Sequence, residues 1–389
     1  MDYSKILNKK IQEVPPSSIR KYFDLLNEMD DCISLGIGEP DFVTPWHIRN
    51  AGIDSLEKGY TKYTPNAGLS NLRKEIANYL KRRFNLEYNP NGEIIVTVGG
   101  SEAIDLALRC LIEDEDEVIV PTPSFVCYGP LSKMSNGVPV YIETKAENNF
   151  KLTADELREA ITPKTKVLIL PYPNNPTGAV MRREDLEAIA EVLRDTNIMI
   201  ISDEIYCELT YSGDHVSIAN IDGMKERTLL VNGFSKSYSM TGWRMGYLCG
   251  PKELLSSIIK LHQYGIMSAP TMSQYAAIDA LKNGDEDIEY FKEQYNGRRR
   301  FLIDGLRNLG LECFEAEGAF YIFPCIKSSG MTSDDFCMSF LKEERVAIIP
   351  GSAFGPGGEG FARLCYANSM ENLQEFLVRL ERFLKKIKK

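Results

Sequence analysis

Short apolar runs alternate with helical patterns through the middle of this 389-residue chain. The runs that we interpret as strands lie at residues 94–98, 118–120, 167–170, 198–201, 229–231 and 247–249. Runs of this kind are typical of strands buried on both faces, and helices between such strands make the crossovers of a parallel sheet. The alternation therefore predicts an α/β domain with a mostly parallel sheet and helices on both of its faces.

Apolar residues at helical spacing lie between these runs. The clearest set recurs every three or four residues and consists of Leu69, Leu72, Ile76, Leu80 and Phe84. Residues at this spacing share one face of a helix. The chain is also longer than the roughly 100 to 200 residues of one typical domain. We therefore expect one large domain and one smaller domain.

The pattern changes near residue 280. A helix is followed by two short strands around residues 319–324, another helix, a strand at 362–366 and a closing helix at 371–386. This order predicts a smaller α+β domain. Prolines and glycines break the first forty residues, which we expect to form an arm that packs on this domain or on a partner chain. The expected divisions are an arm with part of the small domain (1–45), the large domain (46–280) and the small C-terminal domain (281–389).

Composition and charge argue against several classes of function. The formal net charge of −10 disfavours nucleic acid as a partner, because phosphate backbones require a clustered basic face. Nine cysteines without a C-x-x-C pair fit a reducing, cytoplasmic location. We find neither an export signal nor the run of about 18 apolar residues that spans a membrane. His47, His215 and His262 lack the spacing of metal ligands, so we expect no catalytic metal.

Polar residues follow the strands at the edge where an open parallel sheet binds its ligands. Residues 99–103 (GGSEA) come after one strand and open a helix, so their free N–H groups could bind a phosphate. Many helices also simply begin in this way. The turn from Pro173 to Gly178 follows another strand, and its prolines could aim an asparagine side chain, although such turns are common.

Two charged side chains follow the next strands. Asp203 lies at the mouth of a buried strand, where a carboxylate either caps the next element or needs a cationic partner such as a protonated ring nitrogen. Lys236 follows the next run, with Arg244 eight residues further on. A partly desolvated lysine forms Schiff bases because burial lowers its pKa, and an arginine suits a phosphate. On its own, a lysine or an arginine in a sequence is more often a solvated surface charge. Here, however, four strand ends offer an anion-binding turn, an asparagine amide, a carboxylate and a lysine in one fold.

These motifs resemble the class I/II aminotransferases of fold type I, which depend on pyridoxal 5'-phosphate. The family's lysine signature is matched throughout residues 233–246 (GFSKSYSMTGWRMG). The shorter motifs that also match lie at residues 38–42, 62–68, 175–178, 202–206 and 363–367. The resemblance therefore spans nearly the whole chain. It implies a large cofactor-binding domain with a mostly parallel seven-stranded sheet, a smaller α+β domain, and transfer of an amino group from an amino acid to a 2-oxo acid.

The resemblance also implies a role for each matched residue. Lys236 would carry the cofactor as a Schiff base and later move the substrate's α-proton as general acid and base. Asp203 would keep the pyridine nitrogen protonated, which makes the ring an electron sink. Asn175 and Tyr206 would hydrogen-bond to the ring's phenolic oxygen, and Phe125 would stack on the ring face.

The cofactor's phosphate would be bound by residues from several segments. The resemblance assigns this role to the N–H groups around Gly100, Ser101 and Glu102, to Arg244, and to Tyr63 reaching in from a second subunit. If Tyr63 acts in trans, the active unit is a homodimer.

The substrate's α-carboxylate would be bound by Arg363, with Gly38 and the amide of Asn175 beside it.

One departure from the family concerns the phosphate. Many relatives carry a serine three residues before the lysine, where this chain has Gly233, and Ser235 could take over its role.

The side chain of the amino donor would be recognised by the arm, the loop near residues 15–20 and the neighbouring subunit. Some relatives that use acidic substrates have a lysine where this chain has Ser101. We therefore expect an aromatic or broad neutral donor with 2-oxoglutarate as acceptor, while aspartate and acylated diamino acids remain open.

Two other functions use a similar scaffold. A carbon–sulfur β-lyase would eliminate a leaving group from the β-carbon instead of transferring the amino group, but the full lysine signature favours transfer. A transcription regulator that binds pyridoxal phosphate would need an additional amino-terminal DNA-binding domain. Here the motif at 36–41 is reached within forty residues and the chain is acidic, which argues against a regulator.

Overall fold

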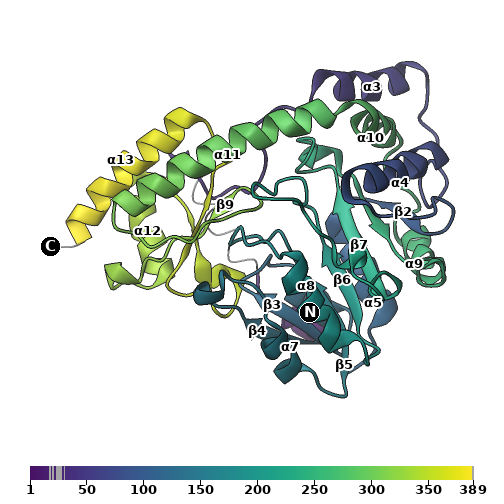
Figure 1. The fold of residues 1–389 in the computed structure, drawn as a ribbon, viewed down its shortest axis with the longest axis horizontal. Coiled ribbons are helices and arrows are strands. Elements are labelled where there is room, and N and C mark those ends of the chain that lie inside the picture. The colour runs from purple at the N-terminus through teal and green to yellow at the C-terminus, as the bar shows by residue number, and fades with distance from the viewer. Residues whose placement is uncertain (17–18, 20–21, 23–28, 30, 388–389) are drawn as a thin grey trace.

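The computed structural model describes residues 1–16, 19, 22, 29 and 31–387 (Figure 1). A seven-stranded sheet forms the centre of the large domain. In spatial order its strands are β2 (Ile94–Thr97), β8 (Gly246–Cys249), β7 (Thr228–Gly233), β6 (Met199–Asp203), β5 (Thr165–Leu170), β3 (Glu117–Thr122) and β4 (Val138–Glu143). Strand β8 is antiparallel to β2 and β7, and the remaining pairs are parallel. The predicted mostly parallel sheet is confirmed.

Helices cover both faces of this sheet, as Figure 1 shows. On one face lie α5 (Gly100–Leu111), α6 (Tyr128–Met134) and α9 (Lys252–Gly265), and on the other lie α7 (Ala154–Ala160) and α8 (Arg183–Leu193). Within β5, Val167 and Ile169 pack with the α5 side, whereas Leu168 and Leu170 pack with the α8 side. Because alternate side chains of a strand point to opposite faces, a strand covered on both faces must be apolar throughout. This explains the continuous apolar run.

Strand β4 was missing from the predicted strands. It lies at the edge of the sheet, where only β3 pairs with it. Its burial is low, with Val138 48% exposed, and Pro139 interrupts the sequence pattern. Proline is tolerated at an edge because one side of the strand needs no N–H donor there. The apolar signal that identified the central strands was therefore absent.

A second group of helices packs beside β2 and β8. Its members are α3 (Trp46–Glu57), α4 (Ser70–Phe84) and α10 (Thr271–Asn283). Leu72, Ile76 and Leu80 of α4 are fully buried in this cluster, and Leu69 and Phe84 are partly buried against it. The predicted helical face is confirmed.

The small domain contains a three-stranded antiparallel sheet in the order β11 (Ile349–Pro350), β12 (Ala362–Cys365), β9 (Tyr321–Ile322). Helices α12 (Ser333–Glu344) and α13 (Met370–Ile387) accompany it. The prediction of two strands around residues 319–324 was wrong, because β9 is the one strand there. The flanking residues Gly318 and Cys325 make only isolated bridges, and Pro324 has no N–H to extend the ladder.

The amino-terminal arm contacts both domains. Its short helix α1 (Lys9–Gln12) lies near α6, and the Lys10 amine donates to Asn136 Oδ1 at 2.6 Å. Further along, β1 (Ile33–Ser34) pairs in parallel with β10 (Val346–Ala347) of the small domain. The long helix α11 (Asp285–Asn308) runs from the α3 and α10 region to the small domain (Figure 1). The division at residue 280 stays a prediction.

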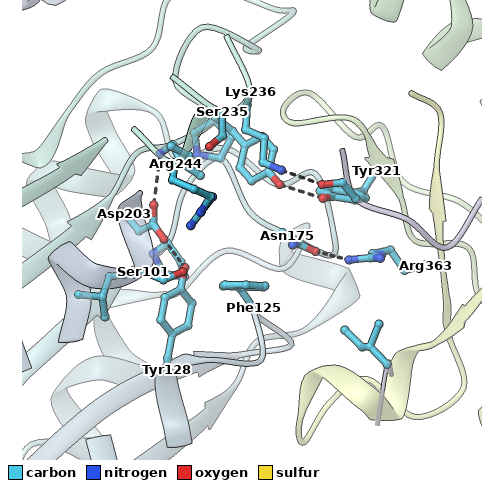
Figure 2. A pocket seen from close by; sticks show the side chains of 18 residues that line it. Ser101, Phe125, Tyr128, Asn175, Asp203, Ser235, Lys236, Arg244, Tyr321 and Arg363 are labelled. Carbon is cyan, nitrogen blue, oxygen red and sulfur yellow. Dashed lines mark hydrogen bonds between the residues drawn. The ribbon is translucent and has the colours of Figure 1, made fainter. Parts of the chain in front are cut away.

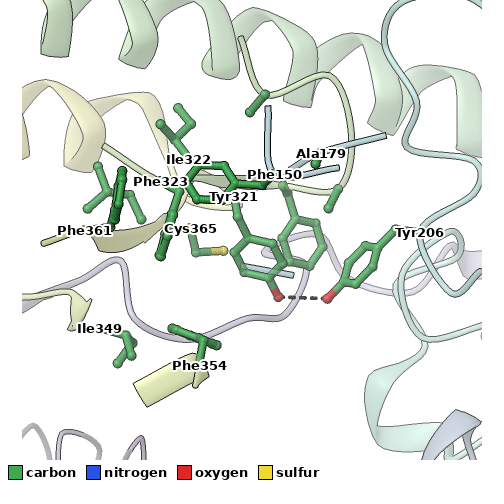
Figure 3. Close-up of a cluster of buried hydrophobic side chains, with 14 of the residues drawn as sticks. Phe150, Ala179, Tyr206, Tyr321, Ile322, Phe323, Ile349, Phe354, Phe361 and Cys365 are labelled. Atoms are coloured by element: carbon green, nitrogen blue, oxygen red, sulfur yellow. Dashed lines mark hydrogen bonds between the residues drawn. The ribbon is translucent and has the colours of Figure 1, made fainter. Parts of the chain in front are cut away.

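An aromatic cluster joins the two domains (Figure 3). Phe323 and Phe361 of the small domain stack with ring centroids 5.1 Å apart. Phe150, from the segment after β4, meets both rings edge-on at 5.5 and 5.3 Å. Aromatic pairs prefer these arrangements and contribute stability beyond their buried area. The cluster therefore helps to hold the small-domain sheet against the carboxyl ends of the large sheet.

The burial of the strands predicts how substitutions at core and edge positions of the sheet differ in their effect on the stability of the protein. Replacing Val167 with alanine should lower the free energy of unfolding by about 2 kcal/mol, because two buried methylene equivalents are lost and a cavity remains. The same replacement at the exposed edge residue Val138 should change stability by less than about 0.5 kcal/mol. Thermal unfolding of both variants followed by circular dichroism tests this difference. Equal destabilisation would contradict the assigned burial.

Candidate active site

A cavity of about 300 Å³ lies at the carboxyl ends of the central strands, between the two domains (Figure 2). This is the edge where open parallel sheets bind ligands. Among the residues assigned above from sequence, those that line the cavity are Gly38, Gly100, Ser101, Phe125, Asn175, Asp203, Tyr206, Ser235, Lys236, Arg244 and Arg363. Residues far apart in the sequence thus converge on one space.

Lys236 lies three residues after β7 and is partly buried. Its Nζ donates to the carbonyl of Gly38 at 2.7 Å and lies 5.8 Å from the ring centroid of Tyr206 and 5.5 Å from that of Phe320. Desolvation in these surroundings lowers the pKa of the amine to about 8. The neutral, nucleophilic amine is therefore a much larger fraction at about pH 7 to 8 than for an ordinary lysine.

Asp203 is the last residue of β6 and is 7% exposed. Its Oδ2 accepts a hydrogen bond from the Tyr128 hydroxyl at 2.8 Å, and Oδ1 accepts one from the N–H of Ile205 at 3.3 Å. Burial raises the pKa of this carboxyl to about 6, and the Tyr128 hydrogen bond opposes the rise. The side chain is thus a buried anion above about pH 6, and no cation among the described residues is bonded to it, so it suits a cationic ligand group.

A cluster of anion-binding groups lies at the start of α5. Gly100 and Ser101 form the first turn of this helix, where N–H groups are free and the helix dipole is positive. Gly99 has φ +79°, and a Cβ placed on it would lie 2.5 Å from Arg244 Nη2. The glycine therefore allows the guanidinium to approach the turn closely. Together these groups could hold a phosphate.

Gly233, the departure from the family pattern noted above, has no room for a side chain here. A Cβ at Gly233 would lie 2.8 Å from the carbonyl oxygen of Met245 and 3.0 Å from Cα of Gly246. Strand β8 passes too close to accept a serine without moving the backbone. Ser235 lines the cavity instead, which places a hydroxyl beside Lys236.

Arg363 extends from β12 and is 3% exposed. Its Nη1 donates to Asn175 Oδ1 at 3.0 Å, and its Nη2 donates to the carbonyl of Gly36. Nε is buried and has no hydrogen-bond partner among the described residues. These partners are neutral, so the charge of the guanidinium is left available for a carboxylate.

Two predicted residues lie outside this cavity. Tyr63 is 83% exposed on the surface of the single chain. The Glu102 side chain turns back along α5, where it accepts from the N–H of Val98 and contacts His262 Nδ1 at 2.9 Å. Its carboxylate therefore binds the backbone just before the helix and is not directed into the cavity.

Sequence reasoning missed two tyrosines. Tyr128 could have been suspected because it lies three residues after Phe125, at the start of a helix. Tyr321 carried no signal, because it reaches the cavity from the small domain. Ile19 also lines the cavity, whereas residues 17, 18 and 20 of the loop expected to recognise the donor lie outside the described residues.

The donor set matches the functional groups of pyridoxal 5'-phosphate. The α5 turn and Arg244 suit its phosphate, the carboxylate of Asp203 suits a protonated ring nitrogen, and the amine of Lys236 suits its aldehyde. Phe125 offers a flat aromatic face. In the described part of the chain, no cluster of three or more His, Cys, Asp or Glu could hold a metal ion, and no helix is long and apolar enough to span a membrane.

The chain is similar to known proteins over most of its length. The family model for aminotransferase class I and II matches residues 30–380. A putative aminotransferase, YugH, of Bacillus subtilis is 50% identical over 380 residues and is covered to 98%, as is this chain. An aspartate aminotransferase of Pyrococcus abyssi is 44% identical over 98% of this chain and 99% of its own.

A solved structure shares the fold. The crystal structure of an aromatic aminotransferase from Pyrococcus horikoshii has a TM-score of 0.90 and 43% identity, over 95% of this chain and 100% of that chain. The chain therefore belongs to the class I and II aminotransferases of fold type I and is an enzyme that uses pyridoxal 5'-phosphate as its cofactor.

Proposed function

We propose that this enzyme transfers the α-amino group of an L-amino acid with an aromatic or other neutral side chain to a 2-oxo acid such as 2-oxoglutarate, with Lys236 carrying the cofactor as a Schiff base. The proposal rests on one observation. The amine of Lys236, whose pKa is lowered, lines the same cavity as the hydrogen-bonded pair Arg363 and Asn175. Lys236 can exchange protons at the α-carbon of the substrate while Arg363 binds its α-carboxylate.

Lys236 and Asp203 divide the chemistry between them. The bound cofactor supplies a ring that accepts the electron pair of the α C–H bond. The Lys236 amine would remove the α-proton of the substrate and return it to the cofactor carbon that receives the amino group. This exchange requires an amine whose pKa is near the working pH. Asp203 holds a proton on the ring nitrogen through its buried carboxylate, and Tyr128 fixes the orientation of that carboxylate.

Arg363 orients the substrate. A guanidinium binds a carboxylate through two parallel hydrogen bonds, and Arg363 is held in place by Asn175 and Gly36. Fixing the carboxylate turns the α C–H bond toward Lys236, and such orientation contributes to the rate by converting a random encounter into a defined geometry.

The cavity wall supports a neutral donor. Ile19, Ile104 and Phe125 contribute apolar surface, and Ser101 occupies the position next to the double glycine. Relatives named for aspartate and for aromatic amino acids are both similar to this chain, so the donor must be identified by experiment.

The active unit is proposed to be a homodimer in which Tyr63 binds the phosphate of the partner's cofactor. The stretch of the chain that leads to Tyr63 has further exposed apolar side chains, namely Trp46, Ile53, Leu56 and Tyr60. The Asn66 amide donates to the carbonyl of Met267 at 2.9 Å, which joins this region to the end of α9, where Tyr264 is 87% exposed. Several exposed apolar side chains in one region support a protein interface.

The reaction and the donor can be tested by absorbance. The cofactor band of the wild type should convert to that of the amine form when a neutral or aromatic amino acid is added, and return with 2-oxoglutarate. Lys236→Ala should lower the transfer rate by about 10⁴-fold or more, because nucleophile and proton carrier are lost together. Lys282→Ala, on the surface of α10, should react normally. Release of pyruvate and ammonia from a cysteine S-conjugate, without any conversion by amino acids, would instead identify a β-lyase.

The lowered pKa of Lys236 predicts how cofactor uptake depends on pH. Because only the neutral amine attacks the aldehyde, the rate of Schiff-base formation by the cofactor-free protein should rise as pH increases toward about 8 and level off above it. Stopped-flow absorbance measures this rate. The same reaction with N-acetyl-lysine methylamide corrects for the cofactor's own titration. A midpoint near the ordinary lysine pKa would contradict the desolvation of the amine.

Tyr63 can be tested by mixing variants. Tyr63→Phe should weaken cofactor binding by about 5- to 10-fold, because one hydrogen bond to a charged group is lost, whereas Tyr60→Phe should have little effect. In a homodimer with Tyr63 in trans, reassociating Tyr63→Phe with Lys236→Ala should restore wild-type affinity and transfer at roughly a quarter of all sites. Equilibrium titration with cofactor measures this fraction. No restoration on mixing would place Tyr63 in cis or outside the site.

A further inference from the structure

Tyr321 enters the active site from the small domain. It lies in β9 and is 1% exposed, yet it lines the cavity between the domains. Its hydroxyl lies 2.8 Å from the hydroxyl of Tyr206, which follows β6 of the large sheet (Figures 2 and 3). This hydrogen bond therefore connects the two sheets inside the site.

The ring of Tyr321 has a different neighbour. Cys365 of β12 pairs directly with Tyr321, so Arg363, two residues earlier on the same face, is its diagonal neighbour. The Arg363 Cζ lies 4.6 Å from the centroid of the Tyr321 ring and 4.8 Å from that of Phe354. A guanidinium over an aromatic face is attracted by the ring quadrupole, and more strongly when it is desolvated. The ring thus helps to hold the guanidinium of Arg363 in place.

The space for the Tyr321 hydroxyl depends on Gly38. A Cβ at Gly38 would lie 2.3 Å from this hydroxyl oxygen, which is closer than two such atoms can approach. The carbonyl of Gly38 accepts the hydrogen bond of Lys236 Nζ at 2.7 Å. Tyr321 therefore lies against the same short segment that contacts the amine.

We propose that Tyr321 is a positioning residue with two separable tasks: its hydroxyl directs the proton of Tyr206, and its ring holds Arg363. The inference rests on the proposed function, on the role proposed above for Arg363 and on the role in binding the cofactor's phenolic oxygen that the resemblance implies for Tyr206. It extends the active site to a residue of the small domain that has no charge and exchanges no proton with the substrate.

The direction of the hydrogen bond follows from the number of protons. Burial raises the pKa of both tyrosines, so each hydroxyl keeps its single proton at neutral pH. When the Tyr206 proton is donated to the phenolic oxygen of the cofactor, the proton shared between the two tyrosines must come from Tyr321. Hydrogen bonds in a chain strengthen one another, so Tyr321 makes Tyr206 a better donor.

The hydroxyl is tested by Tyr321→Phe, which keeps the ring. Loss of the hydroxyl should weaken the donation by Tyr206 and raise the pH midpoint of the absorbance change of the bound cofactor by roughly 0.2 to 0.7 unit. The apparent Kd of the amino donor in the single-turnover half-reaction should stay within about twofold, because the ring under Arg363 remains. An unchanged midpoint would overturn the role of the hydroxyl.

The ring is tested by Tyr321→Leu. Arg363 then loses an aromatic partner, and the apparent Kd of the amino donor should rise about 5- to 30-fold. A Kd equal to that of Tyr321→Phe would overturn the role of the ring. Thermal unfolding of both variants shows whether they fold, and Tyr321→Phe keeps the proposal testable if Tyr321→Leu does not.

Tyr366→Phe is the matched control. Tyr366 is also fully buried near β9, but its hydroxyl donates to the backbone carbonyl of Ala319 at 3.0 Å. This variant should change neither the midpoint nor the Kd, and an equal shift in it would overturn a specific role for Tyr321. Failure of this inference is distinct from failure of the proposed function, because the latter would appear in the wild type as a cofactor band that no amino acid converts.

Discussion

The partly desolvated amine of Lys236 is the constraint around which the rest of the site is arranged. Its hydrogen-bond partner is the carbonyl of Gly38, and its other neighbours are the rings of Tyr206 and Phe320. A cation in these surroundings costs free energy, so the pKa falls to about 8 and the neutral form becomes accessible. The amine is thus reactive because packing removes it from water and gives it neutral neighbours, since a carboxylate partner would stabilise the charged form.

Two further charged side chains of the site, Asp203 and Arg363, also have neutral partners. Asp203 is held by the Tyr128 hydroxyl, and the two Nη atoms of Arg363 are held by the oxygens of Asn175 and Gly36. Because these partners are neutral, the charges are oriented without being neutralised. Buried charges of this kind favour a ligand that brings opposite charges, such as a protonated ring nitrogen for the carboxylate and a substrate carboxylate for the guanidinium. Binding is therefore most favourable when the cofactor and the substrate are both placed with their charges against these two side chains.

The site exists only where two sheets meet. The large sheet supplies Lys236, Asp203 and the α5 turn from its strand ends, while the small sheet supplies Arg363 and Tyr321. The aromatic cluster around Phe150 joins the domains close to this junction. Any movement of the small domain would therefore change the position of Arg363 relative to the amine of Lys236, and the Tyr206–Tyr321 hydrogen bond connects the two sides of the site.

The central strands, the buried face of α4 and the candidate residues at the strand ends could be predicted from the amino-acid sequence. Burial on both sides of a parallel sheet leaves a continuous apolar run and places polar residues at a common edge. Strand β4 escaped prediction, since an exposed edge strand needs no such run. The folded chain was needed to reveal that Tyr128 supports Asp203, that Gly233 has no room for a serine, and that Tyr321 reaches Tyr206 and Arg363. These relations join residues distant in the sequence, and short-range patterns record local backbone preference and burial but not which side chains meet across domains.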